Sequence, residues 1–122
     1  MSEFAKAGAL VERYGFCTVA NFSSDDYIVT RVPLQLERAS ERSLVLTGHV
    51  ARKNAHWRCW EGANKTLCVV TGPHAYVSPT CYEQKLAVPT WNHVTVELVG
   101  HAEIIAEPKA VSALLIDMMK RY

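Results

Sequence analysis

Two adjacent basic residues, Arg52 and Lys53, are followed by Asn54 shortly after an expected strand. The sequence predicts a helix over 51–61, so these three residues stand at its start. Free backbone N–H groups and the helix dipole favour an anion there, and the planar guanidinium of arginine suits phosphate oxygens. The three residues are therefore a candidate phosphate site; the alternative is a solvated helix start with no ligand.

Two further polar residues can complete such a site. His49 ends an expected strand beside the basic pair and can donate a hydrogen bond to a ligand oxygen; alternatively, it is a strand-end histidine bonded to the backbone. Arg31 lies on the polar face of an alternating strand, so it either contacts the same ligand or is an ordinary surface arginine.

Aromatic residues gather further along the chain. His74 and Tyr76 alternate onto one face of a strand, and Trp91 follows a rigid loop containing Pro89. They can form an aromatic wall of a binding site, or a partner subunit's contribution to one. Trp57 and Trp60 are three residues apart on the expected helix, and packing is the better interpretation for both.

The sequence lacks the patterns of a protein-based catalytic site. No serine stands in a nucleophile-elbow context, and the five histidines include no H-x-x-x-H or H-E-x-x-H spacing. Glycine-rich phosphate loops are also missing. Any chemistry is therefore expected to come from a cofactor, and no metal is expected.

Hydrophobic periodicity predicts the elements that must position these residues. Helices are expected over 3–14, over 51–61 and from Pro108 onward, with Ser2 capping the first and Gly15 ending it. Strands are expected over 16–22, 27–37, 44–49, 65–71, 74–77 and 92–105. Gly100 suggests a bulge or bend in the last strand, and Ser78-Pro79 the start of a short helix. About six strands joined by short turns predict a closed or nearly closed antiparallel barrel with flanking helices.

Composition limits the class of protein. A length of 122 residues fits one domain, expected over 1–122, and 49% hydrophobic with 20% charged residues is typical of a globular chain. The N-terminus does not resemble a signal peptide, so we expect a cytoplasmic protein with reduced, buried thiols. The net charge of +1, from 13 basic and 12 acidic residues, does not favour a dedicated DNA-binding protein.

Three ordered motifs carry a family resemblance. They are GHVARKNAHWR (48–58), GPHAYVSP at the start of 72–92, and VPTWN at its end. The chain resembles the FMN-binding family of negative transcriptional regulators of the PaiB type. The resemblance implies an antiparallel split β-barrel related to pyridoxamine-phosphate oxidases, mainly β with flanking helices, with FMN at a homodimer interface. Family members usually continue with a long C-terminal segment, which we expect this chain to lack.

The resemblance also assigns roles to residues. It favours phosphate binding by the basic pair, and it implies that strand backbone next to Arg31 meets the flavin ring edge. The cofactor-binding residues expected on this basis are Thr30, Arg31, Val32, Pro33, His49, Arg52, Lys53, Asn54, Tyr76 and Trp91. Thr80, Cys81 and His93 depart from the residues most frequent in the family.

Three functions remain open at this point. The first is an FMN-binding regulatory module, which the motifs favour. The second is a flavin-dependent oxidoreductase or flavin reductase that uses NAD(P)H and a small molecule, suggested by analogy of fold. The third is direct DNA binding, which the family name invites but neither charge nor a recognition motif supports.

Overall fold

The computed structural model of the chain describes residues 2–62, 64–81 and 88–121. Its elements, in chain order, are α1 (Glu3–Arg13), β1 (Phe16–Ser23), β2 (Asp26–Ala39), β3 (Leu44–Gly48), the 3-10 helix η1 (Ala55–Trp60), β4 (Lys65–Val77), the 3-10 turn η2 (Pro79–Cys81), β5 (Thr90–His101) and α2 (Pro108–Arg121).

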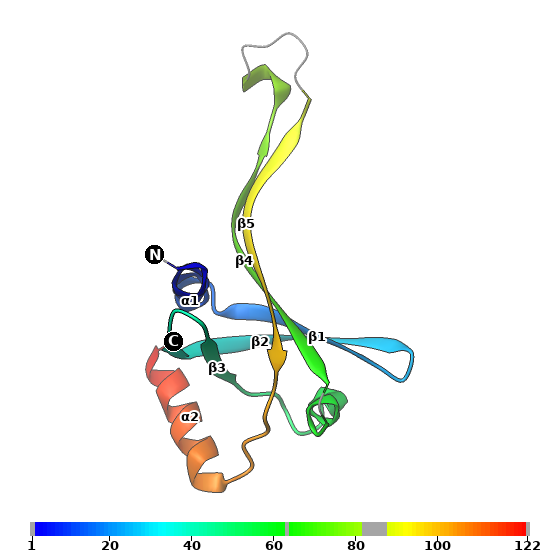
Figure 1. Cartoon of the computed structure of the whole chain (residues 1–122), viewed down its shortest axis with the longest axis vertical. Helices are drawn as coiled ribbons and strands as arrows, with labels where there is room; N and C mark the ends of the chain where they lie inside the picture. Colours follow the sequence, from blue (N-terminus) through cyan, green and yellow to red (C-terminus); the bar gives the residue numbers. More distant parts are fainter. Residues whose placement is uncertain (1, 63, 82–87, 122) are drawn as a thin grey trace.

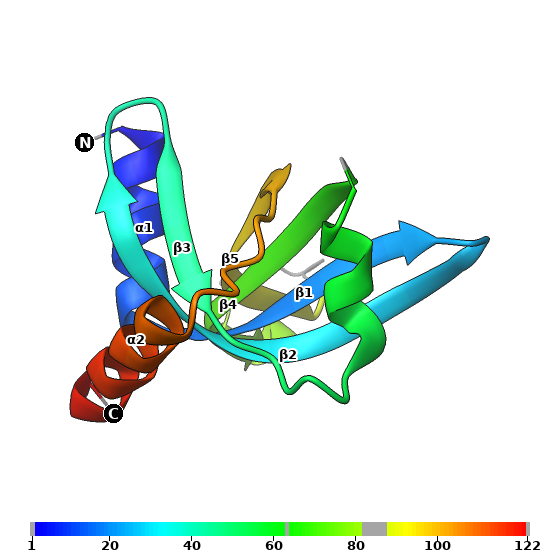
Figure 2. The same cartoon turned by 90° about the horizontal axis from the view of Figure 1, so that it is seen from below.

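The strands form one antiparallel sheet in the order β3-β2-β1-β4-β5 (Figure 1). The prediction of a mainly β fold with flanking helices is confirmed. The sheet is open, with β3 and β5 at its edges. Seen from below in Figure 2, it curves strongly. β4 and β5 continue well past the other strands as a two-stranded ribbon, which we call the arm (71–77 and 90–95).

Two predictions about β4 and β5 were wrong in detail. The segments 65–71 and 74–77 were expected as separate strands, but they form one strand because the ladder to β5 continues past an irregularity between Thr71 and His74. The bulge therefore lies at this point of β4. Gly100, where a bulge was expected, pairs in register with Thr66.

The N-terminal helix follows from its sequence. Ser2 caps α1, since its hydroxyl accepts a hydrogen bond from the backbone N–H of Ala5 at 3.1 Å. Ala7 and Val11 are buried on one side of the helix, and Val11 is fully enclosed. The predicted cap and helix are confirmed.

The β1–β2 hairpin also follows the prediction. Ser24 and Asp25 adopt positive φ angles of 52° and 62°, as the two central residues of a twisted hairpin turn require. Cross-strand pairs then run in register from Ser23 and Asp26 to Phe16 and Pro33. The polar cluster at this turn therefore sets which residues of both strands share a face.

The alternation of the strands separates two faces of the sheet. One face holds the core, formed with α1 by Val11, Cys17, Val19, Val32, Leu34, Cys68 and Val70. The opposite face carries large apolar side chains with high relative exposure: Phe16 68%, Phe22 56%, Tyr27 74%, Val29 60% and Val99 66%. We call this second surface the open apolar face.

The remaining features agree with an ordinary globular interior. Cys17, Cys59 and Cys68 are buried free thiols, as expected. The predicted helix from Pro108 onward is confirmed as α2, and its Val111, Leu114, Leu115 and Met118 are all half-buried. Neither α1 nor α2 combines the length and hydropathy that a membrane-spanning segment needs.

The end of β3 approaches β2 so closely that only glycine fits at position 48. A Cβ added there would lie 2.5 Å from Leu34 Cδ2 and 2.8 Å from the backbone oxygen of Pro33. We expect Gly48→Ala to lower the free energy of unfolding by about 1–3 kcal/mol in urea titrations, the usual cost of overpacking. Gly100→Ala is the control, because nothing lies within 4 Å of its added Cβ. Equal unfolding midpoints for the two variants would contradict this account.

Candidate functional site

A buried polar network joins three strands to η1. Asn21 of β1 is only 3% exposed, and its Nδ2 donates to the backbone oxygen of Lys65 at 2.9 Å and to Thr66 Oγ1 at 3.0 Å. Its Oδ1 accepts from His56 Nε2 at 2.8 Å and from Trp60 Nε1 at 3.1 Å. All four hydrogen-bonding positions of this amide are therefore used inside the protein.

The network fixes the protonation of His56, which is 1% exposed. Since Asn21 Oδ1 can only accept, His56 Nε2 carries a proton, and Nδ1 of the neutral ring accepts from Thr30 Oγ1 at 2.7 Å. Thr30 Oγ1 in turn accepts from Asn54 Nδ2 at 3.2 Å. Burial lowers the pKa of His56, which agrees with a neutral ring.

Asn54 connects this network to a basic turn. Its backbone N–H donates to Ala51 O at 2.9 Å, which closes a turn with Arg52 and Lys53 at its two central positions. Its side-chain oxygen accepts from the backbone N–H of His56 at 3.0 Å and caps η1. Both basic side chains are exposed on a turn whose last residue is bonded to β2.

The predicted helix over 51–61 is therefore corrected. The helical segment is the six-residue 3-10 helix η1, and Arg52 and Lys53 precede it. The capping bond from Asn54 starts the helix only at Ala55, and the burial of His56 holds that start in place. Any attraction of an anion to this turn must come from the two side-chain charges and not from a helix dipole.

The two tryptophans of η1 differ in their contacts: Trp60 packs against the core, as predicted, and Trp57 bonds to the turn. Trp57 Nε1 donates to the backbone oxygen of Arg52 at 3.0 Å, and the Arg58 guanidinium lies 5.6 Å from the centre of the Trp57 ring. Trp60 stacks on His56 with ring centres 4.8 Å apart. Both rings thus hold the backbone on either side of Asn54.

The predicted site residues of β2 and β3 divide between the faces of the sheet. Thr30 and Val32 point into the interior, and Val32 belongs to the core with 3% exposure, so only its backbone is available to a ligand. Arg31 and Pro33 point to the opposite face, where Arg31 is exposed. His49 is exposed directly after β3.

Tyr76 of β4 and Trp91 of β5 belong to the arm, which projects away from the rest of the sheet (Figure 1). They are cross-strand partners with ring centres 5.9 Å apart, and Trp91 Nε1 donates to His74 Nδ1 at 3.0 Å. Both rings are more than half exposed. The rings of His74, Tyr76 and Trp91 therefore lie together on a ribbon that projects away from the basic turn, and their role as the wall of a binding site stays a prediction.

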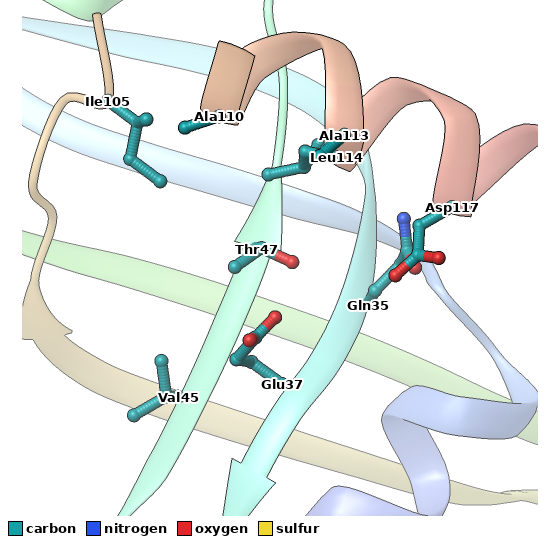
Figure 3. A pocket seen from close by; sticks show the side chains of 9 residues that line it. All are labelled: Gln35, Glu37, Val45, Thr47, Ile105, Ala110, Ala113, Leu114 and Asp117. Carbon is teal, nitrogen blue, oxygen red and sulfur yellow. The ribbon is translucent and has the colours of Figure 1, made fainter. Parts of the chain in front are cut away.

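A pocket of about 460 Å³ lies between α2 and the β2–β3 pair (Figure 3). Its lining residues are Gln35, Glu37, Val45, Thr47, Ile105, Ala110, Ala113, Leu114 and Asp117. The sequence did not predict this pocket, because the alternation of β2 indicates a solvated Gln35 and does not show that α2 covers it.

The sequence also did not predict the buried roles of Asn21 and His56. An asparagine inside the apolar strand of residues 16–22 was the available signal for a buried amide.

Comparison with known proteins confirms the family resemblance. A family model described as "Putative FMN-binding domain" matches residues 1–122. The protein named Protease synthase and sporulation protein PAI 2 from Bacillus subtilis (strain 168) is 32% identical over 112 residues, covering 92% of this chain and 53% of that protein. The chain thus spans about half the length of this curated relative.

The buried histidine predicts a pH-dependent stability. Its folded-state pKa lies below the ordinary value of 6.5, so below that pH the unfolded chain takes up a proton that the folded chain resists. The stabilisation is complete above pH 6.5 and is lost as the pH falls. His56→Gln keeps a donor for Asn21 but does not titrate. We expect it to lower the free energy of unfolding by about 1–3 kcal/mol at neutral pH.

The measurement is urea unfolding of both proteins at neutral and mildly acidic pH. The difference between native protein and His56→Gln should shrink toward acidic pH, because only the native protein carries the titrating group. A difference that stays constant, or grows, on acidification would show that His56 is not held neutral.

Proposed function

The chain belongs to the family of FMN-binding domains, and from this premise we propose that it is a flavin-binding module that works as a homodimer of split-barrel subunits, with the FMN phosphate held at the turn 51–54. The observation that carries the proposal is the anchoring of this turn. A buried network fixes its backbone while Arg52 and Lys53 stay exposed.

The residues present fit the chemistry of FMN. The phosphate dianion needs cationic donors, and Arg52 and Lys53 are adjacent on one short turn. Because Asn54 and Trp57 already hold this turn, little backbone order remains to be gained on binding. The flat ring needs apolar walls and a few polar groups, and the pocket beside α2 supplies both.

Neighbouring residues extend the proposed site from the phosphate toward the ring. His49 lies between β3 and the turn, where its imidazole can donate to phosphate or ribityl oxygens. Arg31 and Pro33 lie on the β2 face that leads toward the pocket, and the backbone of Thr30 and Val32 accompanies them. Bound FMN supplies electron or hydride transfer, and the residues of the chain bind and orient it.

The name of the curated relative suggests the setting of this module. That protein is named for protease synthesis and sporulation. We propose a regulatory role of the same kind, to which this chain contributes the flavin-binding part. The network around His56 serves structure in this proposal, since its polar atoms are bonded to each other and not directed at a substrate.

A second copy of the chain is proposed to cover the open apolar face. Several large apolar side chains there are more than half exposed, which a separate subunit would leave in water. The arm is likewise a two-stranded ribbon with Tyr76 and Trp91 exposed, and isolated ribbons of this kind are marginally stable. In the dimer, these two rings would complete the flavin site of the partner subunit.

Phosphate recognition can be tested by comparing FMN with riboflavin, which lacks the phosphate. Replacing Arg52 and Lys53 together with alanine should raise the Kd of FMN at least about tenfold, since charge-assisted contacts are lost, and leave riboflavin binding unchanged. Fluorescence titration measures both ligands. Arg38→Ala with Arg42→Ala is the charge-matched control at the opposite end of β3. A similar loss for riboflavin would exclude a phosphate-specific turn.

Dimerisation can be tested at Val29, which is 60% exposed on the open apolar face. Val29→Asp should weaken the dimer about 30-fold or more, because it buries a charge at the interface. Light scattering after size-exclusion chromatography measures the mass. Met119→Asp, at an exposed apolar position of α2, should remain dimeric. A native protein that is monomeric with FMN bound would refute the homodimer.

A further inference from the structure

Gln35 is a buried amide with an unused donor. It is 9% exposed, and its Nε2 is buried without a hydrogen-bond partner among the described residues. Buried donors are nearly always paired in folded proteins, so an unpaired one calls for an explanation. Gln35 also lines the pocket beneath α2, so a turn of its side chain toward the pocket would bring Nε2 to an acceptor on a molecule bound there.

The pocket is lined by two kinds of surface (Figure 3). Val45, Ile105 and Leu114 form apolar walls from β3, the segment before α2, and α2 itself. Polar groups come from Gln35 and Thr47, which are cross-strand partners, and from the carboxylates Glu37 and Asp117. The volume of about 460 Å³ is in the range of small-molecule sites.

The pocket is continuous with the proposed phosphate site along the chain. Gln35 follows Pro33 on the same face of β2, since residues two apart in a strand share a face. Thr47 is followed by Gly48 and His49, and then by the turn with Arg52. We assign the anionic end of one ligand to this turn and its flat, partly apolar end to the pocket.

We propose that this pocket holds the isoalloxazine ring of FMN and that Gln35 recognises the pyrimidine edge of that ring. The inference rests on the proposed function, because it assumes that FMN is the ligand. The pyrimidine edge carries two carbonyl oxygens on either side of an N–H group. Gln35 Nε2 donates to one of these oxygens, which gives the buried amide its missing acceptor.

The other lining residues match the rest of the ring. The ring N–H is a donor, and the carboxylates of Glu37 and Asp117 or the Thr47 hydroxyl accept from it. The apolar part of the ring contacts the walls formed by Val45 and Leu114. A simple ammonium compound would suit the carboxylates but would leave the Gln35 donor unpaired, so a ring with carbonyl acceptors fits better.

The first test fills the pocket. Ala113→Trp places an indole in the space, whereas Ser112→Trp adds the same group at the exposed neighbouring position of α2, outside the lining. We expect Ala113→Trp to weaken FMN and riboflavin equally, by about tenfold or more, and Ser112→Trp to leave both unchanged. This pattern differs from that of the basic-turn variant, which affects FMN alone.

The second test observes Gln35 directly and does not depend on a bulky substitution. Gln35→Met keeps the length of the side chain, removes the amide, and identifies the side-chain NH₂ resonance of Gln35 by its loss from the ¹⁵N spectrum. Addition of FMN or riboflavin should shift this resonance in the native protein. Gln35→Met should bind both ligands about three- to tenfold more weakly, as expected for one lost hydrogen bond.

The outcomes separate the two proposals. FMN that binds the native protein without moving the Gln35 resonance, and binds Ala113→Trp as tightly as Ser112→Trp, overturns the ring position and leaves the flavin-binding function standing. Failure of FMN to bind the native protein overturns both. Resonance shifts caused by a simple ammonium salt but not by riboflavin would assign the pocket to a cation instead.

Discussion

The four hydrogen bonds of the Asn21 amide are the constraint on which the rest of the site depends. An amide buried in a strand must find partners inside the protein, because leaving one group unpaired costs about 1–3 kcal/mol. Two partners come from β4 and two from η1, so satisfying Asn21 fixes the helix against the sheet. His56 is hydrogen-bonded to Thr30, and Thr30 to Asn54, so the same network also fixes the position of the basic turn.

The alternation of side chains along β1 and β2 gives the sheet two faces, of which one is buried in the core and the other is exposed. The hairpin turn at Ser24 and Asp25 sets a register that turns Cys17, Val19 and Val32 toward α1. The same register leaves Phe22 and Val29 on the other side, where no described element covers them. Since one register serves both faces, the apolar outer residues cannot be turned inward, and none of the described elements removes this apolar area from water.

Sequence reasoning predicted the elements whose signals are local. The cap at Ser2, the short turn between strands 16–22 and 27–37, and the helix from Pro108 onward all depend on residues a few positions apart, and all three are confirmed. It failed at η1 because a remote partner, Asn21, buries His56 and shortens the helix, which no local periodicity reports. The basic turn was predictable because Arg52, Lys53 and Asn54 are adjacent in the sequence. The network behind it and the covering of Gln35 by α2 were not, because both depend on residues far apart in the sequence.

The two buried carboxamides, Asn21 and Gln35, differ in their hydrogen-bond partners. Asn21 has every bonding position occupied by protein, and it serves to fix the architecture. Gln35 is almost as buried, but its donor has no described protein partner and it lines a cavity. The described residues therefore pair every donor and acceptor of the Asn21 amide but leave Gln35 Nε2 without a partner. Under the proposed ring position, the second amide is left for the ligand, so that the unpaired donor in the free protein becomes a source of affinity and specificity when flavin binds.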